Sequence, residues 1–93
     1  MNEEDQIKKL TAEGFDKVWV YEAEPDELDD VHEHTYDTKL VVLKGDIQIT
    51  MEMAGATVNT LYKQGQEIII PRNEPHSAKV GHEGCRYVVA EKY

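Results

Sequence analysis

The sequence is poor in cysteine and in basic residues. Its single cysteine, Cys85, has no second cysteine with which to form an internal disulfide, so we expect a reducing, cytoplasmic environment. Ten basic residues stand against nineteen acidic ones, giving a formal net charge of −9. Charge of this sign repels nucleic-acid phosphates and anionic membrane surfaces, so we expect neither as a partner.

Long apolar runs are also missing. A membrane-spanning helix needs about 20 consecutive apolar residues, whereas the longest run here, residues 68–71, has the length of a short strand. The first residues, MNEEDQIKKL, lack the basic start and apolar stretch of a signal peptide. The chain has no nucleophile elbow, phosphate-binding loop or dinucleotide fingerprint, which excludes hydrolases and nucleotide enzymes of those types.

The length allows one core, so we expect a single domain over residues 1–93. Residues 2–14 predict a short helix, because Asn2 is a good N-cap, acids fill the first turn and Gly14 follows the last. Only Ile7 and Leu10 form its apolar stripe. We therefore expect this helix on the outside, with little contribution to the core.

From residue 16 onward the pattern is typical of an all-β barrel or sandwich. Short stretches rich in Val, Ile, Tyr and Thr alternate with turn residues. Gly45-Asp46 predicts a tight turn, Gly81 to Gly84 predict a break, and the alternation after Asp46 predicts one buried face. The predicted strands are 16–23, 28–34, 39–44, 47–53, 57–62, 67–71, 76–80 and 85–91.

Three histidines form the candidate site. Residues two apart in an extended strand point the same way, so His32 and His34 can direct two imidazoles at one ion. His76 follows a proline-containing turn, and an adjacent barrel strand would bring it opposite the pair. On their own, His32 and His34 are equally compatible with two solvent-facing histidines.

The spacing of these residues resembles the two motifs of the cupin superfamily, and small bacterial single-barrel cupins in particular. The first motif is His32-Glu33-His34 followed by an apolar strand and Gly45. The second motif is matched at the family spacing by Gly65, Pro71, Asn73 and His76. The resemblance implies one all-β cupin barrel of about eight strands (a double-stranded β-helix, or jelly roll) over residues 16–93. It also implies that His32, His34 and His76 are metal ligands.

The sequence departs from the cupin pattern at three positions. The usual glutamate ligand, four residues after His34, is replaced by Thr38, and the adjacent Asp37 would point away unless a bulge re-aims it. Two expected glycines are Asp26 and Asn73. Asp and Asn tolerate positive φ best among the other residues, so we expect both turns to be kept.

Several other residues are weaker candidates. His82 lies in a polar turn and is expected to be solvated, and Cys85 is expected to be a small buried residue. Arg72 and Arg86 are the two arginines, and Arg72 lies in the turn of the second motif, where it would be placed to hold a substrate carboxylate. The aromatic residues are expected in the core rather than in a pocket; they are Trp19, Tyr21, Tyr36 and Tyr87. The acids between Glu22 and Glu33 are expected to form a solvated loop.

Three neutral imidazoles suit one divalent transition metal, Zn, Fe, Mn, Ni or Co, and leave positions open for water or a substrate. The resemblance to three-histidine cupin dioxygenases implies dioxygenase or isomerase-type chemistry on a small organic substrate. The alternative is a non-catalytic module that binds or senses a small molecule, favoured by the lack of an evident acid or base beside the histidines. No catalytic residue is assigned. An exposed strand edge predicts a homodimer.

Overall fold

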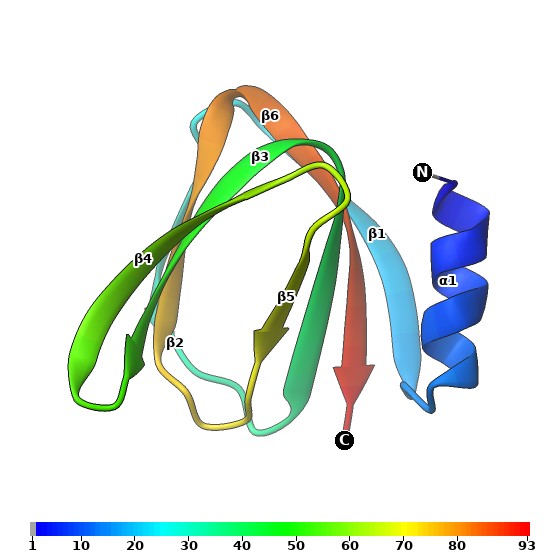
Figure 1. Ribbon diagram of the computed structural model, residues 1–93, viewed down its shortest axis with the longest axis horizontal. Helices are drawn as coiled ribbons and strands as arrows, with labels where there is room; N and C mark the ends of the chain where they lie inside the picture. The colour runs from blue at the N-terminus through cyan, green and yellow to red at the C-terminus, as the bar shows by residue number, and fades with distance from the viewer. Residues whose placement is uncertain (1) are drawn as a thin grey trace.

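The computed structural model describes residues 2–93 and contains one helix and six strands in that range. Figure 1 shows the helix lying to one side of a bent antiparallel sheet. In chain order the elements are α1 (Glu3–Ala12), β1 (Lys17–Ala23), β2 (Leu28–His32), β3 (Asp37–Met53), β4 (Ala56–Lys63), β5 (Glu67–Ile70) and β6 (His76–Lys92). No helix among residues 2–93 is long and apolar enough to cross a membrane.

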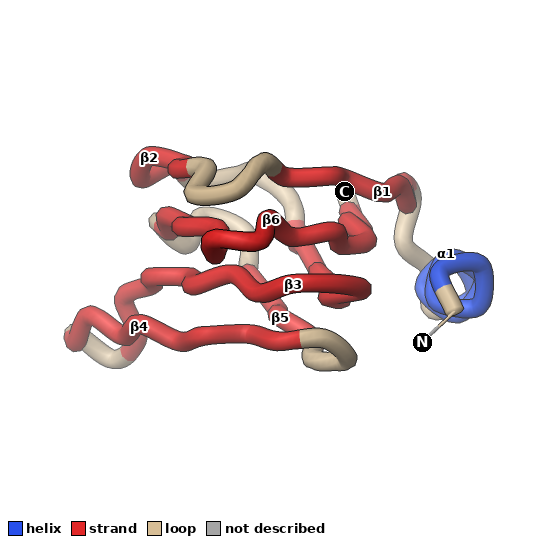
Figure 2. The backbone as a smooth tube through the Cα atoms, turned by 90° about the horizontal axis from the view of Figure 1, so that it is seen from above, coloured by secondary structure: helices blue, strands red, loops and turns tan. Residues whose placement is uncertain are grey.

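The two long strands, β3 and β6, lie side by side and build two facing layers. Their segments 37–45 and 85–92 pair with each other and are flanked by β5 and β1. Their other segments, 47–51 and 76–80, also pair and are flanked by β4 and β2. Figure 2 shows β1, β6, β3 and β4 next to one another in that order. Each layer therefore has four strand segments.

The predicted turn at Gly45-Asp46 is wrong, and so is the break at residues 81–84. Both segments continue as strand, and the β3–β6 register shifts between Val42 and Lys44 and again between Gly45 and Ile47. Gly45 and Gly84 have φ of 80° and 79°, values that glycine adopts without strain. Bulges of this kind bend a strand without ending it. Two pairs of predicted strands are therefore joined into the long strands β3 and β6, and the eight predicted strands become six.

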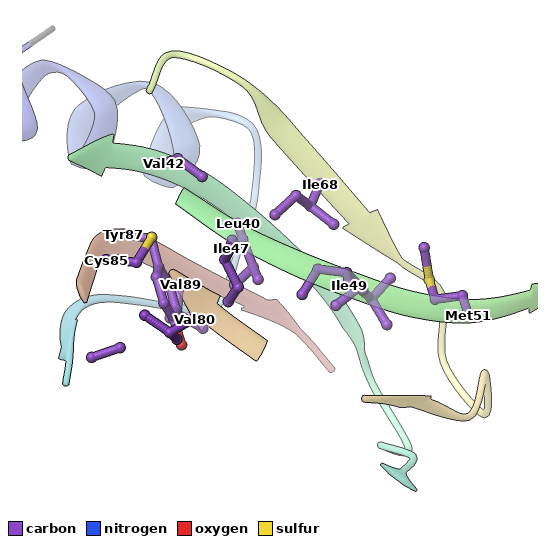
Figure 3. Packing of buried hydrophobic residues seen from close by; sticks show 12 residues of the cluster. Leu40, Val42, Ile47, Ile49, Met51, Ile68, Val80, Cys85, Tyr87 and Val89 are labelled. Carbon is purple, nitrogen blue, oxygen red and sulfur yellow. The ribbon is translucent and has the colours of Figure 1, made fainter. Parts of the chain in front are cut away.

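The main core lies between the two layers. The alternation predicted after Asp46 is confirmed, because Ile47, Ile49 and Met51 are buried and point inward (Figure 3). The other layer contributes Leu40, Val42, Tyr87 and Val89 from β3 and β6, and Ile68 and Ile70 from β5.

Helix α1 covers a second, smaller core on the outer face of one layer. Its N-cap is formed as predicted, with the Asn2 Oδ1 accepting from the Asp5 N–H at 3.2 Å. Leu10 is fully buried against outward-facing side chains of β3 and β6, namely Val41, Leu43, Val88 and Ala90. The helix therefore contributes more to the core than its two apolar residues predict.

Replacing Leu10 by alanine should lower the free energy of unfolding by about 2–5 kcal/mol, the usual cost of truncating a fully buried leucine. Urea denaturation followed by circular dichroism measures this loss. The matched control is Leu28→Ala, because Leu28 is 69 % exposed and surface substitutions change stability by about 0.5 kcal/mol or less. Equal losses for the two variants would mean that α1 does not stabilise the barrel.

Candidate metal centre

Three histidines converge at one end of the space between the layers. His32 ends β2 and lies directly opposite His76, the first residue of β6. His34 lies two residues beyond the end of β2, so the strand predicted over residues 28–34 stops at His32. One ligand atom from each lies within 4.8 Å of the others. The three rings are close together, with centroids 4.2 Å apart for His32 and His76 and 5.1 Å apart for His34 and His76.

Backbone carbonyls orient two of the three imidazoles. The His32 Nδ1 lies 2.7 Å from the Asp30 carbonyl oxygen, and the His76 Nδ1 lies 2.9 Å from the Glu74 carbonyl oxygen. A carbonyl only accepts, so each Nδ1 carries the proton and each Nε2 keeps its lone pair. This is how metal-binding histidines are commonly held.

His34 is held by stacking instead. Its ring lies parallel to the Tyr36 ring, 4.8 Å away, and its Nδ1 is buried without a hydrogen-bond partner. Burial lowers the pKa of His34, and the neighbouring His76 and His32 lower it further. The neutral imidazole, which is the form that binds metal, is therefore favoured at this position.

The donor set fits a divalent transition metal. Ions of this kind bind imidazole nitrogen at about 2.0–2.1 Å, so binding would draw the three ligand atoms, which lie within 4.8 Å of one another, somewhat closer together. Such a set leaves further coordination positions open. His32, His34 and His76 are thus positioned to bind a metal ion.

The turn before β6 joins the two histidine segments. The Asn73 N–H donates to the His34 carbonyl oxygen at 2.7 Å, which ties the second motif to the first. Asn73 and Asp26 have φ of 62° and 61°, which confirms the prediction that both replace glycine at positive φ. The two turns are therefore kept although Asp26 and Asn73 stand where the cupin pattern has glycine.

Thr38 and Asp37 face opposite ways. Thr38 is 5 % exposed, lines the cavity at the histidines, and has no hydrogen-bond partner for its Oγ1. Asp37 instead accepts from the Arg72 backbone N–H at 2.9 Å and from its guanidinium, hydrogen bonds that lower the pKa of Asp37. No bulge re-aims Asp37. The expected placement of Arg72 at a substrate is wrong, because its guanidinium binds Asp37 away from the cavity.

A cavity of about 190 Å³ lies beside the histidines. Trp19, Tyr36 and Tyr87 line it, contrary to the expectation that they serve only as core, while Tyr21 packs behind Tyr87 with ring centroids 5.6 Å apart. The remaining wall is largely apolar; it includes Leu40, Ile47, Ile49, Ile70, Ala78 and Val89. A wider depression of about 520 Å³ lies at the bulges around Gly45 and Gly81, and it contains none of the three histidines.

Two carboxylates in the cavity wall are absent from the candidates predicted from sequence. Glu91, on β6, is 6 % exposed and accepts from the Trp19 Nε1 at 2.8 Å and from the Tyr93 hydroxyl at 2.7 Å. Asp29, on β2, also lines the cavity, so the acidic stretch around it is not wholly a solvated loop. A signal for Glu91 exists, because the inward alternation from Cys85 through Tyr87 and Val89 continues to it.

Two other candidates lie outside this site. His82 is exposed, and its Nδ1 lies 2.7 Å from an Asp26 carboxylate oxygen. Cys85 is buried in the main core, where burial raises the pKa of its thiol to about 12. A thiol with this pKa is protonated and unreactive near neutral pH. Both residues behave as predicted.

Solved structures with a similar arrangement of strands decide the fold. The W96Y form of oxalate decarboxylase from Bacillus subtilis superposes with a TM-score of 0.74 at 17 % identity, over 81 % of this chain and 20 % of that chain. The CENP-C cupin domain of Drosophila melanogaster superposes with a TM-score of 0.73 at 15 % identity, over 81 % of this chain and 59 % of that chain. The chain has the cupin fold.

This chain spans about a fifth of the oxalate decarboxylase chain and about three fifths of the CENP-C chain. No protein-family model matches its sequence, and no curated protein sequence matches it. The similar structures differ in what they bind: oxalate decarboxylase has Mn(II) centres, and the CENP-C cupin has been solved bound to CAL1. Because one fold serves such different partners, the function of this chain has to be argued from its site.

Proposed function

We propose that this cupin holds one divalent transition metal through His32, His34 and His76 and binds a small organic molecule in the cavity beside it. The observation that carries the proposal is the orientation of the histidines. Two of them have Nδ1 occupied by backbone carbonyls, which leaves Nε2 free to bind. A cavity of about 190 Å³ has room for a small ligand only.

Elemental analysis tests the metal. Protein purified without a chelating column should contain, or take up after stripping, about one transition-metal ion per chain. Cobalt(II) is a useful replacement because its visible spectrum reports changes of its ligands. Added imidazole should change that spectrum, since a three-histidine site leaves positions open. A bound cobalt ion whose spectrum does not change with imidazole would indicate a closed structural site. Failure of all divalent ions to bind would contradict the proposal.

The metal, once bound, would supply Lewis-acid activation of an oxygen-containing substrate or, as iron, dioxygen chemistry. Among the described residues, Glu91 and Asp29 are the carboxylates in the cavity wall that are available to exchange a proton with a bound molecule. The lack of an evident acid or base beside the histidines, which favoured a binding module from the sequence, therefore no longer applies. We therefore favour an enzyme of the dioxygenase or isomerase type.

A non-catalytic binding module is the second candidate. It is favoured by Thr38, which stands where the resemblance places a metal-binding carboxylate. The two candidates differ in turnover. Oxygen uptake or isomerisation that is lost on metal removal and in His76→Ala identifies an enzyme, whereas a binding module loses only ligand affinity in both cases.

We also propose that the chain forms a homodimer through a strand edge. The topology leaves β1 and β4 at the ends of the sheet path, and unpaired strand edges are common sites of association. Apolar side chains are exposed on β4 and β5, where Leu61 is 50 % and Ile69 is 66 % exposed. Sedimentation equilibrium should give twice the chain mass, and a monomer at high concentration would contradict this proposal.

A further inference from the structure

The buried carboxylate of Glu91 lies directly across the ladder from Thr38. The two residues are register partners on β6 and β3, so their side chains stand on the same face and point into the cavity. Position 38 is where the cupin pattern has its glutamate. The acid of this site therefore stands on the neighbouring strand, outside the group of ligand atoms formed by the three histidines.

Glu91 is fixed in place and still has capacity to accept hydrogen bonds. Trp19 donates to one carboxylate oxygen and Tyr93 to the other. A carboxylate has about four acceptor positions, so about two remain for a molecule in the cavity. Burial raises the pKa of Glu91, but the hydrogen bonds from Tyr93 and Trp19, together with the nearby charge of Lys17, lower it by more. The Oγ1 of Thr38, opposite Glu91, is buried and makes no hydrogen bond, so it is a second polar atom available to a molecule in the cavity.

Among the described residues that line the cavity, the charged side chains other than histidine are both acidic. They are Glu91 and Asp29, and no lysine or arginine belongs to the lining. Lys17, the register partner of Glu91 on β1, is exposed and does not line the cavity, although its Nζ lies 5.5 Å from the Trp19 ring centroid and its charge lowers the pKa of Glu91. The buried Glu91 and the exposed Asp29 therefore give the lining its two carboxylates.

We infer that Glu91 determines which ligands this cavity accepts, favouring small uncharged molecules that bring a hydrogen-bond donor over carboxylate anions. This inference rests on the proposed metal site. An anionic ligand would bring a further negative charge next to the buried carboxylate of Glu91, which is unfavourable. An uncharged ligand with a hydroxyl or amide N–H avoids this repulsion and donates to Glu91. Selection of this kind works by disfavouring the wrong ligand.

Glycolate and glycolamide form a matched pair of probes, because they have nearly the same shape, both carry a hydroxyl, and the amide replaces the negative charge by an N–H donor. Their affinities for the cobalt-loaded protein are measured by calorimetry and by the visible spectrum. In Glu91→Gln, the ratio of glycolate to glycolamide affinity should rise about tenfold over the wild-type ratio, the size expected when one nearby like charge is removed. Asp37→Asn is the control, since it removes a carboxylate next to Thr38 that points away from the cavity.

Metal content is determined first for every protein, which separates the two proposals. If one ion binds per chain but the ratio is the same in wild type and Glu91→Gln, the role of Glu91 is wrong and the metal site stands. If no ion binds, the proposed function fails, and the role of Glu91 fails with it. Should Glu91→Gln not fold, the wild-type ratio is compared with that of cobalt(II) in buffer. A ratio about tenfold lower in the protein supports the inference, and equal ratios overturn it.

Discussion

Replacing His76 by alanine should lower the affinity of the chain for divalent metal by more than about a hundredfold. Loss of a residue that merely orients a ligand costs about 10–100-fold in affinity, and His76 is predicted to be a ligand itself. The side chain is 5 % exposed and lies against His32, with ring centroids 4.2 Å apart. Competition titration with a chromophoric chelator measures the affinity of each protein for zinc and cobalt.

His82→Ala is the matched control for this experiment. His82 lies on the same strand as His76, but its side chain is exposed and contacts Asp26 instead of the three clustered histidines. The affinity of this variant for metal should equal that of the wild type. Added metal should raise the melting temperature of the wild type and of His82→Ala but not that of His76→Ala. An ion that binds only the folded chain stabilises it to an extent set by its affinity. Equal affinity in His76→Ala and wild type would refute a site built on the three histidines.

Replacing Gly45 by alanine should lower the free energy of unfolding by about 3 kcal/mol or more, or prevent folding. Gly45 has a φ of 80°, and a non-glycine residue in this region costs about 1–2 kcal/mol. In addition, a Cβ at this position would overlap the backbone carbonyl oxygen of Gly84, which cannot move without disturbing the β3–β6 ladder. Overpacking of this kind adds about 1–3 kcal/mol.

Gly55→Ala separates these two contributions. Gly55 has the same φ of 80°, but a Cβ there would have no atom within 4 Å. Its substitution should cost only about 1–2 kcal/mol, the part that comes from the backbone conformation. Urea denaturation of both variants measures the difference. If Gly45→Ala is no less stable than Gly55→Ala, the close crossing of β3 and β6 is not what requires glycine at residue 45.

Some features of the site could be predicted because they depend on local geometry. Positive φ at Asp26 and Asn73 follows from the turn chemistry of Asp and Asn, and the structure confirms both. The convergence of His32 with His76 was predictable only through the resemblance of the two motifs, since nothing local relates residues so far apart. The position of His34 outside β2 was not predictable, because β2 ends where its partner strand begins, with His32 opposite His76.

Strand continuity is where local reasoning failed. Gly45-Asp46 and Gly81 to Gly84 have the composition of turns, yet both are bends within β3 and β6. Glycine at positive φ serves a hairpin turn and a bulge equally well. The pairing partners decide between a turn and a bulge: Gly45 has Cys85 opposite it, and a Cβ on Gly45 would overlap the Gly84 carbonyl oxygen.

The sequence by itself determined the all-β class, the inward face of residues 47–51 and the three histidines, because alternation and motif spacing are properties of the chain. Only the tertiary structure decided that Glu91 faces the histidines across from Thr38 and that Asp37 turns away to Arg72. Strand register determines both facts. Register depends on which distant segments pair and where bulges shift them, and that information is spread over the whole barrel rather than held near either residue.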